Sequence, residues 1–272
     1  MRERTSMDIG IACGFRTTPG QSLGTAIARA AAAAEEAGLV SWWAHGDREA
    51  AADRAHDPVL GLQRVAGATG RIRLGLSGEL LALHSAAVRA KQIASLDWFG
   101  GGRLEVGLDL TAPPAVLADP FRDVGDHVDR ALDNLGAMRA LWTQRRASHK
   151  GEHVAFDGAI ALPKPAGDRV PATHLRATST ETLERYVAAC GAPDGWLTWR
   201  EGAAGLVASA AVLAGVLGDA ADGVRRTWCV PVADLPAARE AVDVLPVRVD
   251  ELVAELDHLP TDDEIAAIAA FA

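Results

Sequence analysis

Hydrophobic and polar positions along this chain alternate between two spacings. Short apolar runs with the period of a strand are followed by longer segments in which apolar residues recur three and four positions apart, as in a helix. The predicted strands are residues 7–13, 40–45, 71–81, 103–110, 171–177, 194–199, 226–232 and 243–249, with helices between them. A repeated strand–helix order indicates parallel strands joined by crossover helices.

The repeat predicts the α/β fold class and a single domain over residues 1–272. Eight strand–helix units favour a closed (β/α)8 TIM barrel over an open doubly wound sheet. No strand is followed by the G-x-G-x-x-G pattern typical of the Rossmann alternative. After the fourth strand a helix over 124–142 precedes a predicted hairpin in GEHVAFDGAIALPKP (151–165), so we expect an insertion after strand 4.

Local signals refine three of these elements. Asp57 and Pro58 are typical of a helix N-cap and first helical position, and predict a helix over 57–70. Neighbouring residues of a strand point to opposite sides, so only one of Trp42 and Trp43 is expected to face the barrel interior. The apolar run at 202–218 is rich in Ala and Gly and is predicted to be a packed helix rather than a membrane span.

Composition and charge exclude several classes of partner. Hydrophobic residues make up 49% of the chain and aromatic residues 5%, so the core is built mainly from Ala, Val and Leu. The net charge of -9 argues against nucleic-acid and membrane partners, which are bound through clustered Lys and Arg. Cys13, Cys190 and Cys229 are too far apart for a metal motif, and their odd number argues against a disulfide framework. With no signal peptide at the start, a cytoplasmic protein is expected.

Polar residues cluster at the predicted carboxyl ends of the strands, where barrel enzymes place their chemistry. Asp109 ends the strand 103–110 among apolar neighbours, and so lies either in a site or at the point where a buried strand reaches solvent. The other polar residues at such ends are His45, Asp47, Ser77, Glu79, Thr111, Arg176, Thr178, Ser179, Thr180, Trp199 and Arg200. No metal site is predicted: His149 and His153 are four apart, but Gly151 between them argues against a shared helix.

Several segments together resemble the bacterial luciferase-like superfamily of flavin- and deazaflavin-dependent oxidoreductases. They include AKQIASLDWFGGGRLEVGL, the helix ending in ALW, GEHVAFDGAIALPKP and APDGWLTW, in matching order from residue 7 to about 200. The resemblance implies a barrel that binds FMN or coenzyme F420 and acts on a small organic substrate as an oxidoreductase or monooxygenase. It also implies pairing through barrel helices, so a homodimer is one possible assembly.

The resemblance assigns candidate site residues but also shows departures. Many relatives have an acidic residue followed by histidine after strand two, whereas WWAHGD places His45 two residues early. His45 is therefore either a catalytic residue or a structural, hydrogen-bonded one. Relatives have a glycine-rich turn after strand four where this chain has Asp109, whose carboxylate would repel an anionic cofactor unless Arg176 or His45 pairs with it. When paired, Asp109 is a second catalytic candidate, which would position the histidine as a proton donor. These departures leave a second hypothesis: a barrel that has lost cofactor binding and catalysis and serves as a binding or partner subunit.

Two further segments match the family in cofactor binding. The bond between Ser77 and Gly78 aligns with a strand-three bulge at which some relatives place a cis peptide against the flavin, so a cis bond or a strained bulge is expected here. Thr178, Ser179 and Thr180 precede a helix whose free N–H groups can hold the cofactor phosphate, with Arg176 nearby. The alternative for the threonine–serine loop is a plain helix cap.

Overall fold

A computed structural model describes residues 7–272 except 17–19, 21, 54, 113–114 and 116–125. Eight parallel strands close into a barrel in the order β1-β10-β9-β8-β7-β4-β3-β2. These strands are β1 (Asp8–Cys13), β2 (Ser41–Ala44), β3 (Arg73–Glu79), β4 (Leu104–Leu108), β7 (Ala172–Arg176), β8 (Gly195–Trp199), β9 (Arg225–Pro231) and β10 (Glu251–Leu256). The predicted TIM barrel is therefore confirmed.

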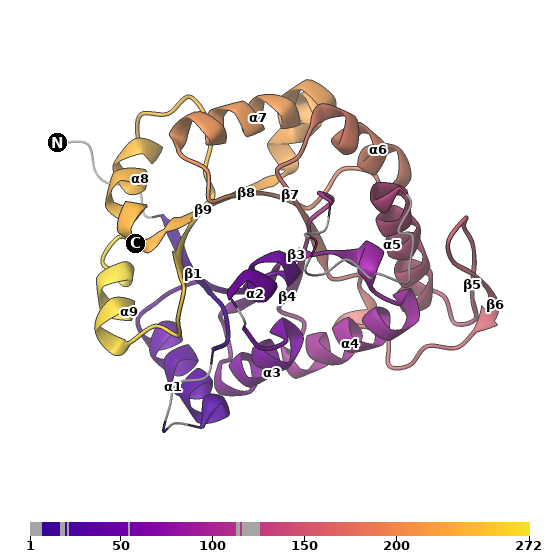
Figure 1. Cartoon of the computed structure of the whole chain (residues 1–272), viewed down its shortest axis with the longest axis horizontal. Coiled ribbons are helices and arrows are strands. Elements are labelled where there is room, and N and C mark those ends of the chain that lie inside the picture. Colours follow the sequence, from indigo (N-terminus) through magenta and orange to yellow (C-terminus); the bar gives the residue numbers. More distant parts are fainter. Residues whose placement is uncertain (1–6, 17–19, 21, 54, 113–114, 116–125) are drawn as a thin grey trace.

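Helices form a ring around the strands, and all but the last of them connect one strand to the next (Figure 1). They are α1 (Leu23–Glu36), α3 (Pro58–Ala68), α4 (Ala86–Phe99), α5 (His127–Thr143), α6 (Thr180–Cys190), α7 (Ala203–Leu217), α8 (Leu235–Val242) and α9 (Asp262–Ala269). As predicted, Pro58 begins α3 and the Asp57 side chain accepts a hydrogen bond from the Leu60 amide. The insertion is the antiparallel hairpin of β5 (Ala147–Lys150) and β6 (Ala155–Ala159), which lies outside the ring and begins earlier than predicted.

The last barrel strand lies elsewhere than predicted. Residues 243–249 follow α8 without forming a strand, and β10 occupies Glu251–Leu256 instead. Alternation of apolar and polar residues in DVLPVRVD imitates a strand, but a central barrel strand is buried on both faces and needs two pairing partners. The segment Glu251–Leu256 meets both conditions, since it is buried throughout and pairs with β1 and β9.

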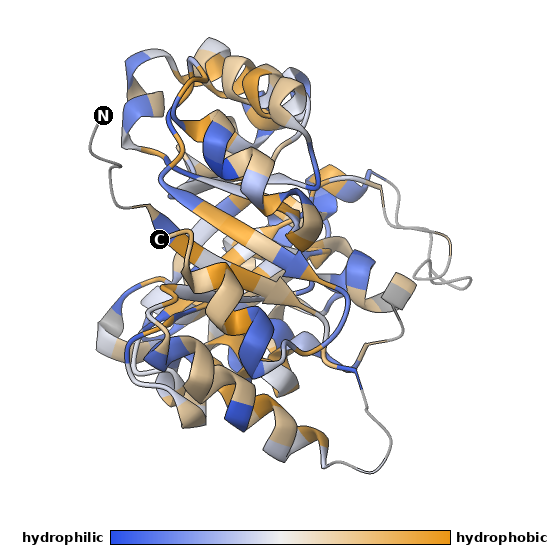
Figure 2. Ribbon diagram, turned by 90° about the vertical axis from the view of Figure 1, so that its left-hand side faces the viewer, coloured by the Kyte–Doolittle hydropathy of each residue, from blue (hydrophilic) through white to orange (hydrophobic). Residues whose placement is uncertain are grey.

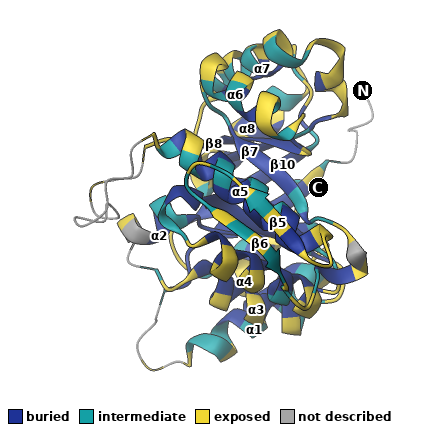
Figure 3. Ribbon diagram, turned by 90° about the vertical axis from the view of Figure 1, so that its right-hand side faces the viewer, coloured by how far each residue is buried: buried dark blue, intermediate teal, exposed yellow. Residues whose placement is uncertain are grey.

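The hydrophobic core has two layers. The larger layer lies between strands and helices and includes Trp42, whereas the smaller fills the barrel and includes Trp43, Leu197 and Trp199. The prediction that only one of the two adjacent tryptophans faces the interior is thus confirmed. Figure 2 shows hydrophobic colours along the central strands, and Figure 3 shows that those strands are buried while the outer helices carry the exposed residues.

One helical stretch among the described residues, Ala203–Gly223, is long and apolar enough to cross a membrane by length and composition. Its first part is α7, the crossover helix between β8 and β9, which packs on the barrel through Leu206, Ala210 and Leu213. The expected packed helix is present, although most of its surface faces outward.

Candidate active site

A short helix, α2 (Asp47–Asp53), lies across the barrel mouth formed by the carboxyl ends of the strands (Figure 1). Its first turn carries Asp47 and Glu49, which favour the positive end of the helix dipole, and alanines follow at 50–52. This helix was not among the elements predicted from the sequence, although the acidic first turn and the alanine run were its signal. Because α2 covers the mouth, it brings residues next to β2 against residues of β3, β4 and β7.

Arg176 is the central residue of the mouth. From the end of β7 its guanidinium donates from Nη1 to Glu49 Oε1 at 2.6 Å and from Nε to the Ser77 carbonyl at 2.9 Å. The same group lies over the Trp199 ring, with Cζ 4.8 Å from the ring centroid. Arg176 and Glu49 are both buried. Arg176 therefore connects α2, β3 and β8 through one side chain. Its partner Glu49 is a member of the site that was not predicted from the sequence.

Asp109 is buried at the same barrel mouth, and neighbouring arginines compensate its negative charge. Its Oδ2 atom accepts from Arg48 Nε at 3.0 Å, and Arg176 Nη1 lies 3.8 Å away. Its Oδ1 atom accepts from the Thr111 amide at 2.8 Å, which holds the turn after β4. The main partner is Arg48, rather than the Arg176 or His45 considered from sequence. Repulsion of an anionic cofactor by Asp109 is weakened accordingly.

His45 is buried below the mouth, against β10. Its Nε2 atom lies 3.2 Å from Glu255 Oε1. Burial raises the pKa of Glu255, but hydrogen bonds and charge from His45 and Arg200 outweigh it and lower that pKa to about 2. Trp199 Nε1 also donates to Glu255. His45 does not line the mouth pocket described below, so the geometry favours the structural interpretation; its catalytic role stays a prediction.

The end of β3 contains the expected bulge but not the cis bond. The strand register shifts between Leu76 and Glu79, and the cis peptide among the described residues is Leu162–Pro163, so the Ser77–Gly78 bond is trans. Ser77 Oγ accepts from the Gly46 amide at 2.8 Å. A Cβ atom on Gly78 would lie 3.0 Å from Arg176 Nε. The end of β3, which was expected to lie against the flavin, is therefore covered by the Arg176 side chain.

A groove of about 620 Å³ opens at the start of α6, where the phosphate loop was predicted. Ser179 Oγ accepts from the Thr182 amide at 3.2 Å and so caps the helix. Among the described residues no acceptor meets the amides of Thr180 and Glu181. The groove is lined by Leu110, Thr111, Asp126, His127, Val128, Thr178, Ser179, Glu181, Thr182 and Arg185.

The groove and the barrel mouth are adjacent. A mouth pocket of about 210 Å³ is lined by Arg48, Asp109, Thr111, Arg176, Ala177, Leu197, Trp199 and Glu201. Thr111 belongs to both linings, so the two hollows meet beside the turn after β4. Of the predicted residues, Asp109, Arg176, Thr178 and Ser179 line these hollows, whereas His45, Ser77, Gly78 and Thr180 do not.

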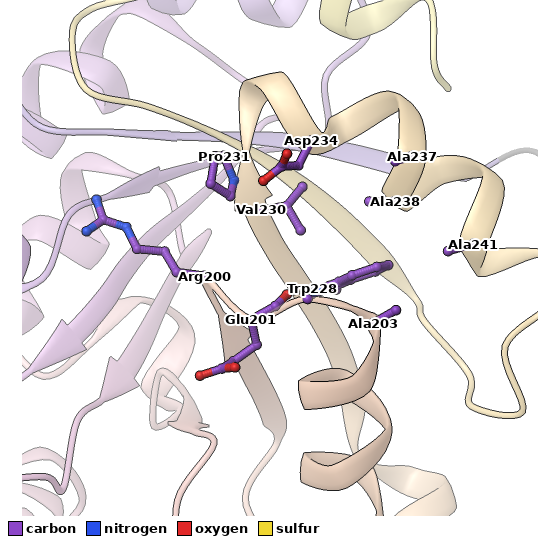
Figure 4. A pocket seen from close by; sticks show the side chains of 11 residues that line it. Arg200, Glu201, Ala203, Trp228, Val230, Pro231, Asp234, Ala237, Ala238 and Ala241 are labelled. Carbon is purple, nitrogen blue, oxygen red and sulfur yellow. Dashed lines mark hydrogen bonds between the residues drawn. The ribbon is translucent and has the colours of Figure 1, made fainter.

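A second pocket of about 280 Å³ lies between α7 and α8 (Figure 4). Trp228, Ala203 and the alanines of α8 give it an apolar lining, and Glu201 lines both this pocket and the mouth pocket. Arg200, which also lines it, holds a left-handed backbone with φ of 58° and pairs through Nε with Glu255 Oε2 at 2.5 Å. An apolar hollow thus adjoins the polar mouth.

The two ends of the site differ in how they suit a flavin or deazaflavin. The groove offers the Glu181 amide, which has no acceptor among the described residues, together with the Thr178 hydroxyl and the Arg185 guanidinium, and such groups bind phosphate. The mouth pocket is smaller than the roughly 300 Å³ at which small-molecule pockets begin. The groove residues therefore fit the phosphate-bearing arm of such a cofactor. The mouth pocket does not fit the cofactor's ring while Arg176 pairs with Glu49.

A closed (β/α)8 barrel with a polar mouth beside a helix N-terminus defines the class of TIM-barrel proteins. Within this class, the chain matches the family model of luciferase-like monooxygenases over residues 7–245 and belongs to that family. An uncharacterized protein of Mycobacterium tuberculosis is 35% identical over 145 residues, which cover 53% of this chain and 50% of that protein. The chain therefore spans about half the length of the relatives it matches.

Two solved structures share the fold. The F420-dependent tetrahydromethanopterin reductase of Methanopyrus kandleri superposes with a TM-score of 0.73 at 12% identity, covering 97% of this chain and 98% of the other. The oxygenating constituent of 3,6-diketocamphane monooxygenase from Pseudomonas putida, in complex with FMN, gives a TM-score of 0.68 at 18% identity, with coverage of 88% and 71%. At these identities the likeness shows the fold alone.

Proposed function

We propose that this protein is an oxidoreductase that uses FMN or coenzyme F420 to act on a small organic substrate, as a monooxygenase or by hydride transfer. The observation that carries the proposal is the groove at the start of α6, because it meets the barrel mouth at Thr111. A phosphate-bearing cofactor bound there would have its other end directed to the mouth. Membership of the luciferase-like family, and the F420 and FMN named for its structural neighbours, support the same cofactor class.

The chain's own residues would bind and orient the cofactor. The phosphate would be held by the Glu181 amide and by the side chains of Thr178 and Arg185. The cofactor, once bound, supplies the redox chemistry. Arg185 now pairs with Asp126 at 2.7 Å and with Asp129, whose Oδ1 lies 2.6 Å away. It would share its charge with the phosphate, and Asp126 and Glu181 would limit the affinity.

The test is an equilibrium titration of the full chain with FMN, reduced FMN and F420, followed by fluorescence. Arg185→Gln removes the cation from the groove and leaves two acids uncompensated, so affinity should fall about tenfold or more, since a charge-assisted hydrogen bond contributes about 1.5–3 kcal/mol. Arg139→Gln is the matched control, because Arg139 donates to the Cys190 carbonyl at the opposite end of α6. Equal affinity in the wild type and both variants would show that the groove does not bind the cofactor.

The second hypothesis, a barrel without cofactor that serves as a binding or partner subunit, is favoured by one observation. Arg176 lies over Gly78 and pairs with buried Glu49, so a ring cannot rest on the end of β3 as it stands. If a folded wild-type protein bound none of the three cofactors at high micromolar concentration, this second function would replace the first.

We also propose a cytoplasmic homodimer. Leu60 on α3 and Phe99 on α4 are 68% and 60% exposed and line one pocket between these helices. Val88 is 58% exposed and lies three helical turns before Phe99 on the same side of α4. Such a face suits a second copy of the chain, because large exposed apolar groups otherwise remain in water. The free thiols Cys13, Cys190 and Cys229 suit a reducing compartment.

A further inference from the structure

Three side chains that commonly bind metals meet beside the barrel mouth. Asp47 begins α2, Glu79 ends β3, and His84 follows the short 3-10 helix η1 (Leu81–Leu83). One ligating atom from each lies within 4.8 Å of the others. The closest pair is Asp47 Oδ2 and His84 Nε2 at 2.8 Å. Three separate elements therefore converge on one small volume.

Glu79 supplies an independent reason to expect a cation. Its side chain is fully buried, and Arg89 binds one carboxylate oxygen, Oε2, through Nε and Nη2. The other oxygen, Oε1, is buried without a hydrogen-bond partner among the described residues. An unpartnered buried acceptor costs about 1–3 kcal/mol, and more when it belongs to a charged group. A cation or a proton on Oε1 would remove that cost.

We propose that Asp47, Glu79 and His84 form a binding site for a divalent transition-metal ion, with Zn²⁺ as the ion that fits best. Ligand bonds of about 2.0–2.2 Å at a tetrahedral ion place neighbouring ligand atoms about 3.3 Å apart. The Asp47–His84 pair would need to open slightly, and Glu79 to approach by at most about 1.5 Å, because all three ligand atoms already lie within 4.8 Å of one another. An imidazole with two carboxylates suits Zn²⁺, whereas Ca²⁺ and Mg²⁺ take shells of oxygen ligands.

Neighbouring groups already orient the ligands. The Leu80 amide donates to Asp47 Oδ2 at 2.8 Å, and Arg89 holds Glu79 by Oε2. Arg89 leaves Glu79 Oε1 as the carboxylate oxygen without a partner among the described residues, and supporting hydrogen bonds of this kind are typical around metal ligands. Two carboxylates and one guanidinium leave a net charge of -1 for the ion to meet. His84 and Asp47 are partly exposed, with side chains 29% and 15% accessible, so an ion and a coordinating water can reach the site.

A bound ion would fasten the start of α2 to the end of β3. Glu49, the partner of Arg176, lies two residues after Asp47 on the same short helix. The ion would thus hold the helix that covers the mouth, and its role would be structural. It would stabilise the folded chain in proportion to its concentration above the dissociation constant.

The test uses the full chain after EDTA treatment and removal of the chelator. Isothermal titration with Zn²⁺ is expected to show one site per chain, and Co²⁺ should give the visible absorption of a tetrahedral complex. In His84→Ala the dissociation constant should rise at least tenfold, and Asp47→Asn, which retains an acceptor for the Leu80 amide, should weaken binding as well. Zn²⁺ should raise the melting temperature of the wild type more than that of either variant.

His149→Ala is the matched control. His149 Nε2 lies 2.5 Å from Asp133 Oδ1, so this pair also joins a histidine to a carboxylate, but it belongs to no three-ligand group among the described residues. Metal affinity in this variant should equal that of the wild type. Absence of saturable Zn²⁺ binding in the wild type, or equal affinity in wild type and His84→Ala, would overturn the proposal. Both results are independent of cofactor binding, because no cofactor is added.

Discussion

The pairing of Glu49 with Arg176 makes a sharp prediction about the barrel mouth. If a cofactor ring enters only when this pair opens, Glu49→Gln should bind the cofactor more tightly while folding less stably. Glutamine keeps the shape and one acceptor for Arg176 Nη1, which lies 2.6 Å from Glu49 Oε1, but removes the charge. Arg176 retains the Ser77 carbonyl and the nearby Asp109, so its own charge stays partly compensated.

The magnitude follows from the geometry. Two unit charges about 4 Å apart at an effective dielectric constant of about 20 attract by about 4 kcal/mol, and desolvation of both groups reduces the net value to about 1.5–3 kcal/mol. Since Arg176 keeps two other partners, the free energy of unfolding should fall by about 1–2 kcal/mol, measured as a lower urea midpoint with an unchanged slope. If ring entry no longer has to break this pair, FMN or F420 should bind about five- to thirtyfold more tightly.

The control for this variant is Glu201→Gln. Glu201 lines the same pocket and carries the same charge, but its carboxylate lies near Gly205 at the start of α7 rather than beside Arg176. It therefore reports the general effect of removing a negative charge near an anionic cofactor. If Glu49→Gln lowered stability yet left affinity unchanged or weaker, or if both variants tightened binding equally, the pair would not be the barrier to ring entry.

Three other predictions address stability and assembly. In the folded chain the pKa of Glu255 is lowered from about 4.5 to about 2. This shift contributes stability that is present above pH 4.5 and is lost as the pH falls towards 2. Glu255→Gln should therefore flatten the acid limb of a plot of unfolding free energy against pH, and an acid limb parallel to that of the wild type would contradict this. Glu251 is fully buried at the base of the barrel, with Arg73 Nη2 at 3.1 Å and Arg225 Nη2 at 3.7 Å. Glu251→Ala should therefore lower the free energy of unfolding, measured in urea, by about 3–5 kcal/mol. A loss below about 1 kcal/mol would count against this ion-pair network. Phe99→Asp should convert a dimer into a monomer in light scattering, whereas the exposed Val244→Asp should not; a wild-type monomer would refute the proposed face.

Local patterns were sufficient for the order of elements and for the barrel. Strand and helix periods, caps such as Asp57 with Pro58, and the opposite directions of Trp42 and Trp43 depend on neighbours in the chain, so they can be recognised without a structure. The pattern was misleading at 243–249, where alternation imitates a strand. Pairing of Glu251–Leu256 with β1 and β9 decides the true position, and that pairing joins distant segments.

From the sequence, only the location of the site at the carboxyl ends of the strands could be predicted. That Asp109, Arg176, Thr178 and Ser179 share one face follows from barrel geometry, because the carboxyl ends of all parallel strands meet there. Which groups compensate each other does not follow. Arg48 reaches Asp109 across 61 positions and Arg176 reaches Glu49 across 127, because barrel closure and the seating of α2 bring them together. Burial makes these contacts strong, and burial is a property of the packed molecule rather than of any local segment.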